Sequence, residues 1–573
     1  MFLLAITNTE IACDLQSQSY EINNLKIDSS VVTIVTDNFL SKFISEENGF
    51  SLIESPLLPH QNFRDIVFSQ VSYTKKSNSF EILKSTISGR PIYYHIDSKG
   101  NFFCSTHISM LRKSGVLIEE NTAVLPEFFC YGELMPPATL YKNINQLPGG
   151  SQLILKLENG KWKIVRIKDY LPPLPNDKES GNIDSISNHT LMLLDDTIRE
   201  LIPCKDKISV LLSGGLDSSI LCKICKSKYG IDTTYSTGYP FENPNNNTEK
   251  IYALSAADAL KTKHSHFEVT TKEYLQGILK GISEAEEPLG HLHAGLLYPL
   301  FKAGIPQNKN IVISGAGADA TWGLDTLDLL YLSNKPFFKL LLGYPQIKLM
   351  KIVSDITGRG GGLIEIAMNI QKGYPISDPR HFIWSFGSCD EEWILKYFGV
   401  NKSDMIKGRY NSIRQFERRS IFDIFFIYAF LGALQPPQSM WSKIGESQGK
   451  ILYFPFSQYK LLNYAFSIPS ELKLKKPKNI LREVARKCEI PEFILSRPKR
   501  GFETAEKNWA ERGSILEPLV PLAIKVFDEK QIRSMQSLDP KKAMTYWNII
   551  NYSIWNRLCI NNEPVEILLD ELN

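Results

Sequence analysis

The chain has 573 residues, of which 43% are hydrophobic and 22% are charged, and its formal net charge is only +3. This length predicts two or more domains, and a small net charge without a basic block argues against nucleic acid as a main partner. Nine scattered cysteines favour a reducing compartment, so we expect a cytoplasmic protein. The longest apolar stretch, residues 421–434, contains Asp423 and predicts a buried helix rather than membrane insertion.

Residues 1–172 carry short β-like runs separated by turns, which predicts a first domain of α+β type. The first six residues lack a basic start and predict a first strand rather than a signal peptide. A further strand is predicted at residues 91–96, before a turn at 97–100. Residues 173–183, rich in proline and polar residues, are predicted to be a linker.

Residues 184–573 form the second predicted domain. Short apolar runs at 208–212, 233–237 and 310–314 alternate with helical patterns. This alternation predicts a doubly wound α/β domain. Long helical runs dominate from about residue 415 onward, so we expect a helical C-terminal part.

A glycine turn joins the apolar run 208–212 to a predicted helix. Glycines let the backbone come close to a ligand, and the first N–H groups of a helix favour an anion. Because Asp217 would repel bare phosphate, we expect a Mg²⁺-bound nucleotide. The predicted nucleotide-binding residues of this loop are Leu212, Ser213, Gly214, Gly215, Leu216, Asp217, Ser218 and Ser219.

Residues 310–320 repeat the pattern of a strand, a glycine turn and an acid. Ser314 and Gly315 are predicted to face the nucleotide from this second turn. Asp319 either shares one Mg²⁺ with Asp217 or caps the following helix. Two carboxylates with phosphate oxygens and water suit octahedral Mg²⁺, so we favour the metal role.

The Ser-Gly-Gly-x-Asp-Ser pattern resembles the pyrophosphate-binding loop of ATP pyrophosphatases. Nearly the whole chain resembles the glutamine-dependent asparagine synthetase family. The segments that carry this resemblance are residues 89–94, 131–140, 144–149, 287–288, 453–456, 478–482 and 497–502. The resemblance implies a glutaminase-like sandwich domain followed by an α/β pyrophosphatase-loop synthetase domain, similar to adenine nucleotide α-hydrolases. It also implies that a carboxylate is adenylated, with release of pyrophosphate and later of AMP.

The resemblance further implies roles for several side chains. Lys499, in the segment Arg-Pro-Lys, would stabilise charge on the leaving group. Lys478 and Arg482 lie one helical turn apart and either face the phosphates or belong to a solvated face. Thr237, at the end of the second strand, would contact the adenosine. Cys222 and Cys225, on the helix after the loop, are interpreted as core packing.

Phe2 departs from the family pattern, because the family carries a cysteine nucleophile at this position that hydrolyses glutamine. The first domain is therefore predicted to be catalytically inactive. Without ammonia from glutamine, the amine and the carboxylate are expected on one substrate, as in the related β-lactam synthetases and lasso-peptide cyclases. We favour a lasso-peptide macrolactam cyclase, with a precursor peptide as substrate and a leader-binding protein and leader peptidase as partners.

A second departure concerns the general base. Ala316 stands where asparagine synthetases have Glu and β-lactam synthetases have Tyr, and Ile451 stands near the second expected position. Glu446 is the nearest acid and is predicted as a catalytic residue. Further candidates are Glu286, Glu287, His291 and His293.

Other functions stay open. The alternatives are a synthetase using free ammonia on a small acid, a small-molecule cyclase, a tRNA-modifying pyrophosphatase and a non-catalytic binding relative. Aromatic residues between 324 and 421, among them Phe337, Phe338, Trp384 and Trp393, either line a peptide site or belong to the core.

Overall fold

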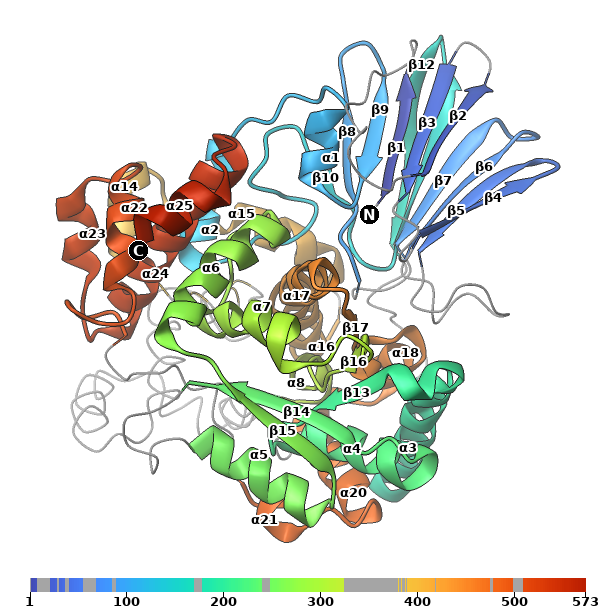
Figure 1. The fold of residues 1–573 in the computed structure, drawn as a ribbon. Coiled ribbons are helices and arrows are strands. Elements are labelled where there is room, and N and C mark those ends of the chain that lie inside the picture. Colours follow the sequence, from blue (N-terminus) through green and yellow to red (C-terminus); the bar gives the residue numbers. More distant parts are fainter. Residues whose placement is uncertain are drawn as a thin grey trace.

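The computed structural model describes residues 2–7, 21–27, 30–36, 41–54, 69–84, 89–169, 178–239, 248–323, 380, 383, 387, 389–417, 419–474, 478–497 and 509–572. Two antiparallel sheets and one parallel sheet organise these residues (Figure 1). Among the described helices, none has the length and apolar character needed to cross a bilayer.

The first antiparallel sheet has the strand order β10-β8-β9-β1-β3-β2. The predicted first strand is confirmed, since β1 pairs with β3 and β9 in the middle of this sheet. Its neighbour β3 is rich in valine, isoleucine and threonine, which suit a pleated, buried surface. The bounds are β1 Phe2–Thr7, β2 Glu21–Ile27, β3 Ser30–Thr36, β8 Tyr93–Ile96, β9 Phe102–Ser105 and β10 Asn145–Gln146.

The second antiparallel sheet has the order β12-β11-β7-β6-β5-β4. Its bounds are β4 Ser41–Glu46, β5 Gly49–Glu54, β6 Ser69–Thr74, β7 Ser79–Lys84, β11 Ser151–Glu158 and β12 Lys161–Asp169. Buried side chains of both sheets form one cluster, in which Leu4 and Ile34 meet Phe80 and Trp162. The two sheets therefore pack face to face.

The parallel sheet lies below these sheets in Figure 1 and has the order β15-β14-β13-β16-β17. Its bounds are β13 Ile208–Leu211, β14 Thr233–Gly238, β15 Lys263–Glu268, β16 Ile311–Ile313 and β17 Ile451–Tyr453. The predicted α/β content is confirmed, and β13, β14 and β16 fall on the three predicted runs. Because β13 and β16 are neighbours, the two predicted glycine turns leave the sheet side by side.

Helices cover both faces of the parallel sheet. On one face, α3, α4 and α20 share a buried cluster with Ile208 and Ile313. On the other face, α6 and α17 share a second cluster with Val312 and Leu452. The bounds are α3 Ile183–Arg199, α4 Leu216–Tyr229, α5 Thr248–Ala259, α6 Thr271–Ala285, α7 Leu297–Pro299, α8 Ala318–Trp322, α17 Gln435–Ser447, α18 Tyr459–Ser467, α19 Ser470–Leu474, α20 Asn479–Lys487 and α21 Glu492–Leu495.

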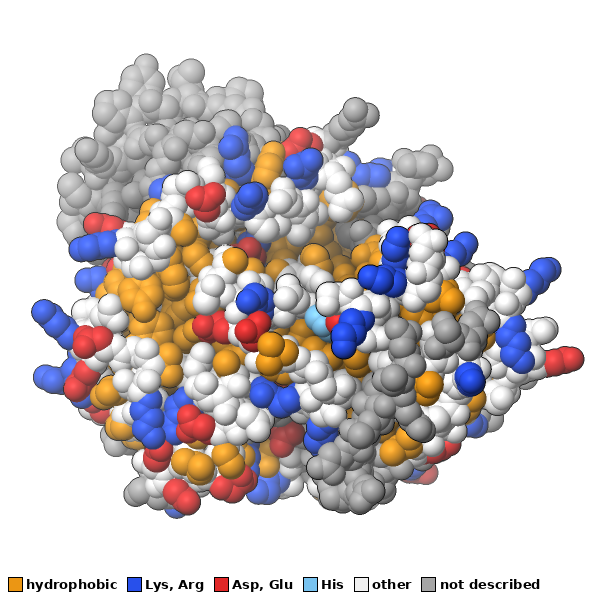
Figure 2. Space-filling model, turned by 90° about the horizontal axis from the view of Figure 1, so that it is seen from above, with side chains coloured by type: hydrophobic (Ala, Val, Ile, Leu, Met, Phe, Trp, Pro, Cys, Tyr) orange, Lys and Arg blue, Asp and Glu red, His pale blue; other side chains and the backbone are white. Residues whose placement is uncertain are grey.

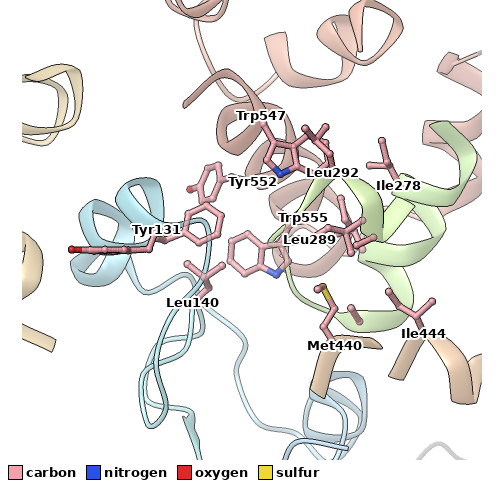
Figure 3. Close-up of a cluster of buried hydrophobic side chains, with 14 of the residues drawn as sticks. Tyr131, Leu140, Ile278, Leu289, Leu292, Met440, Ile444, Trp547, Tyr552 and Trp555 are labelled. Atoms are coloured by element: carbon pink, nitrogen blue, oxygen red, sulfur yellow. The ribbon is translucent and has the colours of Figure 1, made fainter. Parts of the chain in front are cut away.

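The remaining helices join the first domain to the C-terminal part. The apolar run 421–434 forms α16 and continues as a π-helical turn, so the predicted buried helix is confirmed. The bounds are α1 Ile108–Lys113, α2 Leu125–Tyr131, α14 Glu391–Phe398, α15 Lys402–Ile413, α16 Ile421–Tyr428, α22 Val520–Ile524, α23 Glu529–Met535, α24 Pro540–Trp555 and α25 Val565–Leu572. Figure 3 shows Tyr131 and Leu140 of the first domain beside Tyr552 and Trp555 of α24.

Candidate active site

A cavity of about 380 Å³ opens where β13, β14 and β16 end. This is the edge of a parallel sheet at which α/β proteins bind ligands. Its described lining residues are Leu211, Leu212, Ser213, Gly215, Leu216, Asp217, Ser218, Tyr235, Ser236, Thr237, Glu249, Ala253, His293, Leu296, Leu297, Leu300, Ser314, Gly315, Ala316, Asp319, Trp441, Lys478, Arg482, Ile494 and Arg497.

The first glycine turn is shaped by its own hydroxyl groups. Ser213 Oγ lies 3.2 Å from Ser218 Oγ and accepts a hydrogen bond from the Gly215 backbone N–H at 3.3 Å. Gly214 has a φ of +72°, and a Cβ there would lie 2.4 Å from the Tyr252 carbonyl oxygen. Glycine is therefore required at 214, because a side chain would collide with α5. The turn leads into α4, whose first N–H groups have no partner within the helix.

Lys478 joins the two acids that the sequence predicts to meet. Its ammonium forms ion pairs with Asp217 and with Asp319, the latter at 2.7 Å. Burial opposes the charge of Lys478, but the two carboxylates outweigh burial and raise its pKa. Asp319 lies in the first turn of α8, whose N-cap is Gly317, so both the metal role and a stabilising role at the start of this helix stay predictions.

Two carboxylates that reach one ammonium can also share one cation. Asp217 and Asp319 supply hard oxygen donors, and the adjacent turn offers room for phosphate oxygens that would complete the coordination of Mg²⁺. Among the described residues, no group of three or more metal-ligating side chains exists. The donor set therefore fits a metal that arrives with a polyphosphate rather than a metal held by protein alone.

Arg497 links the glycine turn to α5. Its guanidinium donates to the Ser213 carbonyl at 3.0 Å, pairs with Glu249 and lies 4.0 Å from the centre of the Tyr252 ring. Neither Arg497 nor Glu249 was predicted to have a role in the site. The Arg-Pro-Lys segment gave a signal for Arg497, but Glu249 carries no local motif.

Among the described lining residues of the cavity, His293, Trp441 and Ala316 carry uncharged side chains at pH 7. His293 lies with its ring centre 5.8 Å from that of Trp441, and its ring stacks on His291 at 5.3 Å. Burial, with a smaller contribution from His291, lowers the pKa of His293 to about 3, so its imidazole is neutral at pH 7. Ala316 also lines the cavity, and its carbonyl accepts a hydrogen bond from Gln438 of α17 at 3.3 Å.

The structure brings most of the predicted site residues together. The predicted residues that line the cavity are Leu212, Ser213, Gly215, Leu216, Asp217, Ser218, Thr237, Ser314, Gly315, Asp319, Lys478 and Arg482. Gly214 belongs to the same turn but packs against Tyr252 of α5 and is not a lining residue, and Ser219 is fully buried. Lys499 lies outside the described residues, as do Phe337, Phe338 and Trp384.

Glu446 is not placed at the cavity. Its carboxylate is buried in an ion pair with Arg90 of the first domain, and it is not among the lining residues. Ile451 is buried in β17, also away from the lining. Cys222 and Cys225 are fully buried, and burial raises the pKa of Cys222 to about 12, which fits their interpretation as core.

Phe2 is buried between the two antiparallel sheets. Its backbone N–H donates to Thr106 Oγ1 at 3.1 Å, and its carbonyl accepts from Ser105 Oγ at 2.7 Å. The ring packs in the same cluster as Leu4 and Phe102. A phenyl group offers no nucleophilic atom, so the first strand begins without the thiol that glutamine hydrolysis requires.

Comparison with known proteins agrees with this geometry. The family model described as asparagine synthase matches residues 189–359 and 414–548. A Bacillus subtilis protein named asparagine synthetase [glutamine-hydrolyzing] 1 is 22% identical over 425 residues, which are 73% of this chain and 65% of that protein. A putative asparagine synthetase [glutamine-hydrolyzing] of Mycobacterium bovis is 21% identical over 456 residues, 75% and 66% of the two chains.

A shorter match is to a Methanocaldococcus jannaschii protein named putative asparagine synthetase [glutamine-hydrolyzing] 2. It is 24% identical over 255 residues, 44% of this chain and 48% of that protein. The chain therefore covers less than two thirds of the length of each of these three relatives.

Proposed function

Because the chain belongs to the asparagine synthase family, we propose that it is an ATP-dependent ligase that adenylates a carboxylate and then forms an amide. One observation carries this proposal. Two strand ends bring Asp217 and Asp319 onto one cation site in a cavity that also holds a glycine turn and a helix N-terminus. This set suits the pyrophosphate of Mg²⁺-ATP.

The described lining residues have different proposed roles in binding ATP and Mg²⁺. The turn at 213–218 binds the β- and γ-phosphates, and Thr237 and its neighbours on β14 receive the adenosine. Asp217 and Asp319 hold Mg²⁺, which neutralises phosphate charge when bound. A substrate carboxylate oxygen attacks the α-phosphorus, and the bond to pyrophosphate breaks. An amine then attacks the acyl carbon, and AMP leaves with the carboxylate oxygen.

Three uncharged lining residues support one substrate class. Ala316, Trp441 and neutral His293 present no full charge to the cavity at pH 7. Free aspartate would bring an ammonium group and a second carboxylate, both of which are costly to bury without a partner. An aspartyl or glutamyl side chain within a peptide has amides at those positions. The described lining therefore favours a peptidyl carboxylate over a free amino acid.

Phe2 supports an intramolecular reaction, because a phenyl group at this position cannot release ammonia from glutamine. We therefore propose that the amine comes from the same peptide, which gives a macrolactam of the lasso-peptide type. The precursor peptide, a leader-binding protein and a leader peptidase would then be its partners, in the cytoplasm. A β-lactam-type cyclase lacks support from Ala316, and a synthetase using free ammonia stays the main alternative.

Exchange of labelled pyrophosphate into ATP tests the proposal. We expect exchange with N-acetyl-L-aspartyl amide or a precursor peptide and little with free L-aspartate. Asp217→Ala should abolish exchange, whereas Asp184→Ala, an exposed carboxylate on α3 outside the cavity, should not change it. Full exchange by Asp217→Ala would refute the metal role, and asparagine formation that depends on added ammonium would establish the alternative.

A further inference from the structure

Glu286 contacts both the first domain and helix α17, which contributes Trp441 to the cavity. Its carboxylate accepts hydrogen bonds from the backbone N–H groups of Ile108 and Ser109, both at 2.8 Å, in the first turn of α1. The same carboxylate pairs with Lys443 of α17 at 2.5 Å. Glu286 and Lys443 are both buried. One side chain thus holds three segments that are far apart in the sequence.

The backbone of Glu286 is held as tightly as its side chain. The residue ends α6 with a left-handed φ of 56°, which non-glycine residues adopt only where their surroundings impose it. Its carbonyl accepts hydrogen bonds from the Tyr141 hydroxyl and, at 3.2 Å, from Trp555 Nε1. Tyr141 belongs to the first domain and Trp555 to α24. The turn after α6 is therefore fixed from both sides.

The two segments that meet at Glu286 also carry His293 and Trp441. These two uncharged side chains line the cavity and are called the uncharged wall below. His293 follows Glu286 by seven residues, and the backbone N–H of Leu289 between them donates a hydrogen bond to Asn551 Oδ1 at 2.9 Å. Trp441 precedes Lys443 by two residues on α17. The ring centres of His293 and Trp441 lie 5.8 Å apart. Both rings therefore lie on segments that Glu286 also contacts or terminates.

We propose that the first domain positions this wall, with Glu286 as the positioning residue that transmits the constraint from α1 to His293 and Trp441. The role of the wall in holding the substrate rests on the proposed function. A buried carboxylate is costly without its partners. Glu286 must therefore keep α1 and Lys443 at hydrogen-bond distance. The first domain would then be required for substrate binding, although Phe2 stands in place of the family's nucleophile.

A proline at position 108 tests the constraint from the side of the first domain. Ile108 is the first residue of α1, and His107 before it is extended with φ −135° and ψ 136°, which suits the residue before a proline. Ile108→Pro removes the N–H that Glu286 accepts. Ile108→Ala is the matched control, because it also shortens the buried side chain but keeps the N–H.

We expect Ile108→Pro to raise the KM for N-acetyl-L-aspartyl amide about tenfold, the order of effect of one hydrogen bond to a charged group. The KM for ATP should stay unchanged. Hydrogen–deuterium exchange should increase in residues 289–297 and 436–447 but not in residues 213–219. Equal behaviour of the proline and alanine variants, or a parallel rise of the KM for ATP, would overturn the proposal.

Two further variants keep the test decisive if the proline variant does not fold. Glu286→Gln should give the same selective rise in KM and in exchange. Tyr552→Phe removes another bond between the domains, to Glu120, that involves neither segment of the wall, and should leave the KM values unchanged. If no carboxylate supports pyrophosphate exchange in the wild type, the proposed function fails, while hydrogen–deuterium exchange still decides whether Glu286 transmits the constraint.

Discussion

Lys478 is the residue on which the charge of the site depends. Its ammonium lies between Asp217 and Asp319, where the proposed Mg²⁺ would also be held. Two carboxylates so close together repel each other unless a cation separates them. Lys478 therefore preserves the arrangement of the two acids in the absence of a nucleotide, and the same lysine is well placed to contact phosphate when one is bound.

Replacing Lys478 by methionine should make the site depend on divalent cations. We expect Lys478→Met to melt at a lower temperature than the wild type, and MgCl₂ to raise the melting temperature of the variant more than that of the wild type. Pyrophosphate exchange should fall about 100-fold, as when one charge-stabilising group is removed from an active site. NaCl at matched ionic strength is the control, and an equal effect of both salts would contradict the prediction.

The sequence predicted this part of the site because its residues lie directly after strands. Asp217 and Asp319 follow two apolar runs, and the carboxyl ends of parallel strands share one edge of a sheet. Trp441 and Glu249 lie on helices without a local motif, so only the tertiary fold shows them at the cavity. Glu446 is near in sequence to the expected position, but helix α17 directs it toward Arg90.

At the scale of elements, the crossing between α6 and the turn at 292–296 determines where His293 lies. Gly277 of α6 approaches this turn so closely that a Cβ would lie 2.1 Å from the Gly295 carbonyl oxygen. A capping box formed by Thr270 and Glu273 fixes the beginning of the same helix. The chain therefore uses the absence of a side chain at 277 to bring the backbone of the turn against the helix.

Alanine at 277 should separate the two elements. In an open helix, Gly→Ala stabilises by about 1 kcal/mol, but here the collision should outweigh this gain and lower the free energy of unfolding by about 1–3 kcal/mol. Gly281→Ala, in the same helix, is the matched control, because its Cβ would meet neighbours only at 3.4 Å or more. Chemical denaturation measures both variants, and equal stability of the two would contradict the prediction.

Strands and helices with clear patterns could be predicted from the sequence, and their contacts could not. The runs at 208–212, 233–237 and 310–314 predicted three strands; the first and third are rich in apolar residues, and the second is rich in β-branched residues. The crossing at Gly277 depends on Gly295, and nothing in either segment indicates the other. The order of the five strands likewise depends on contacts between distant segments.

At the scale of the molecule, the first domain and the C-terminal helices share one buried core. Leu3 and Phe103 belong to the same cluster as Trp547 and Leu568. The sequence change near 173–183 predicted two domains, and this prediction stays untested as a statement about separate folding units. On the face shown in Figure 2, lysine and arginine side chains are interspersed with aspartate and glutamate rather than gathered into a stripe.

Glu133, in the connection after α2, makes this core sensitive to pH. It lines a small cavity between the first domain and α17, and burial raises its pKa to about 8 despite nearby Arg409. The unfolded chain has a glutamate pKa of about 4.3. The folded state therefore binds an extra proton between these values, so the contribution of Glu133 to stability is present at low pH and is lost as the pH rises toward 8.

We expect Glu133→Gln to be more stable than the wild type above pH 8, because glutamine fills the same space without an ionisable group. The difference in melting temperature between the two proteins should decrease as the pH is lowered toward 5. Glu119→Gln, which changes an exposed carboxyl of the same domain, should show no such dependence. A constant difference across the pH range would contradict the assignment of Glu133.

The packing of α24 against the first domain has a consequence for biosynthesis. Tyr141 and Trp555 are in ring contact, yet about 400 residues separate them along the chain. At about 5–20 residues per second, a ribosome needs roughly 20–80 s to make that stretch. During this time the apolar surface around Tyr131 and Leu140 has no native cover from α24, so the nascent chain is prone to non-native contacts until its last helices emerge.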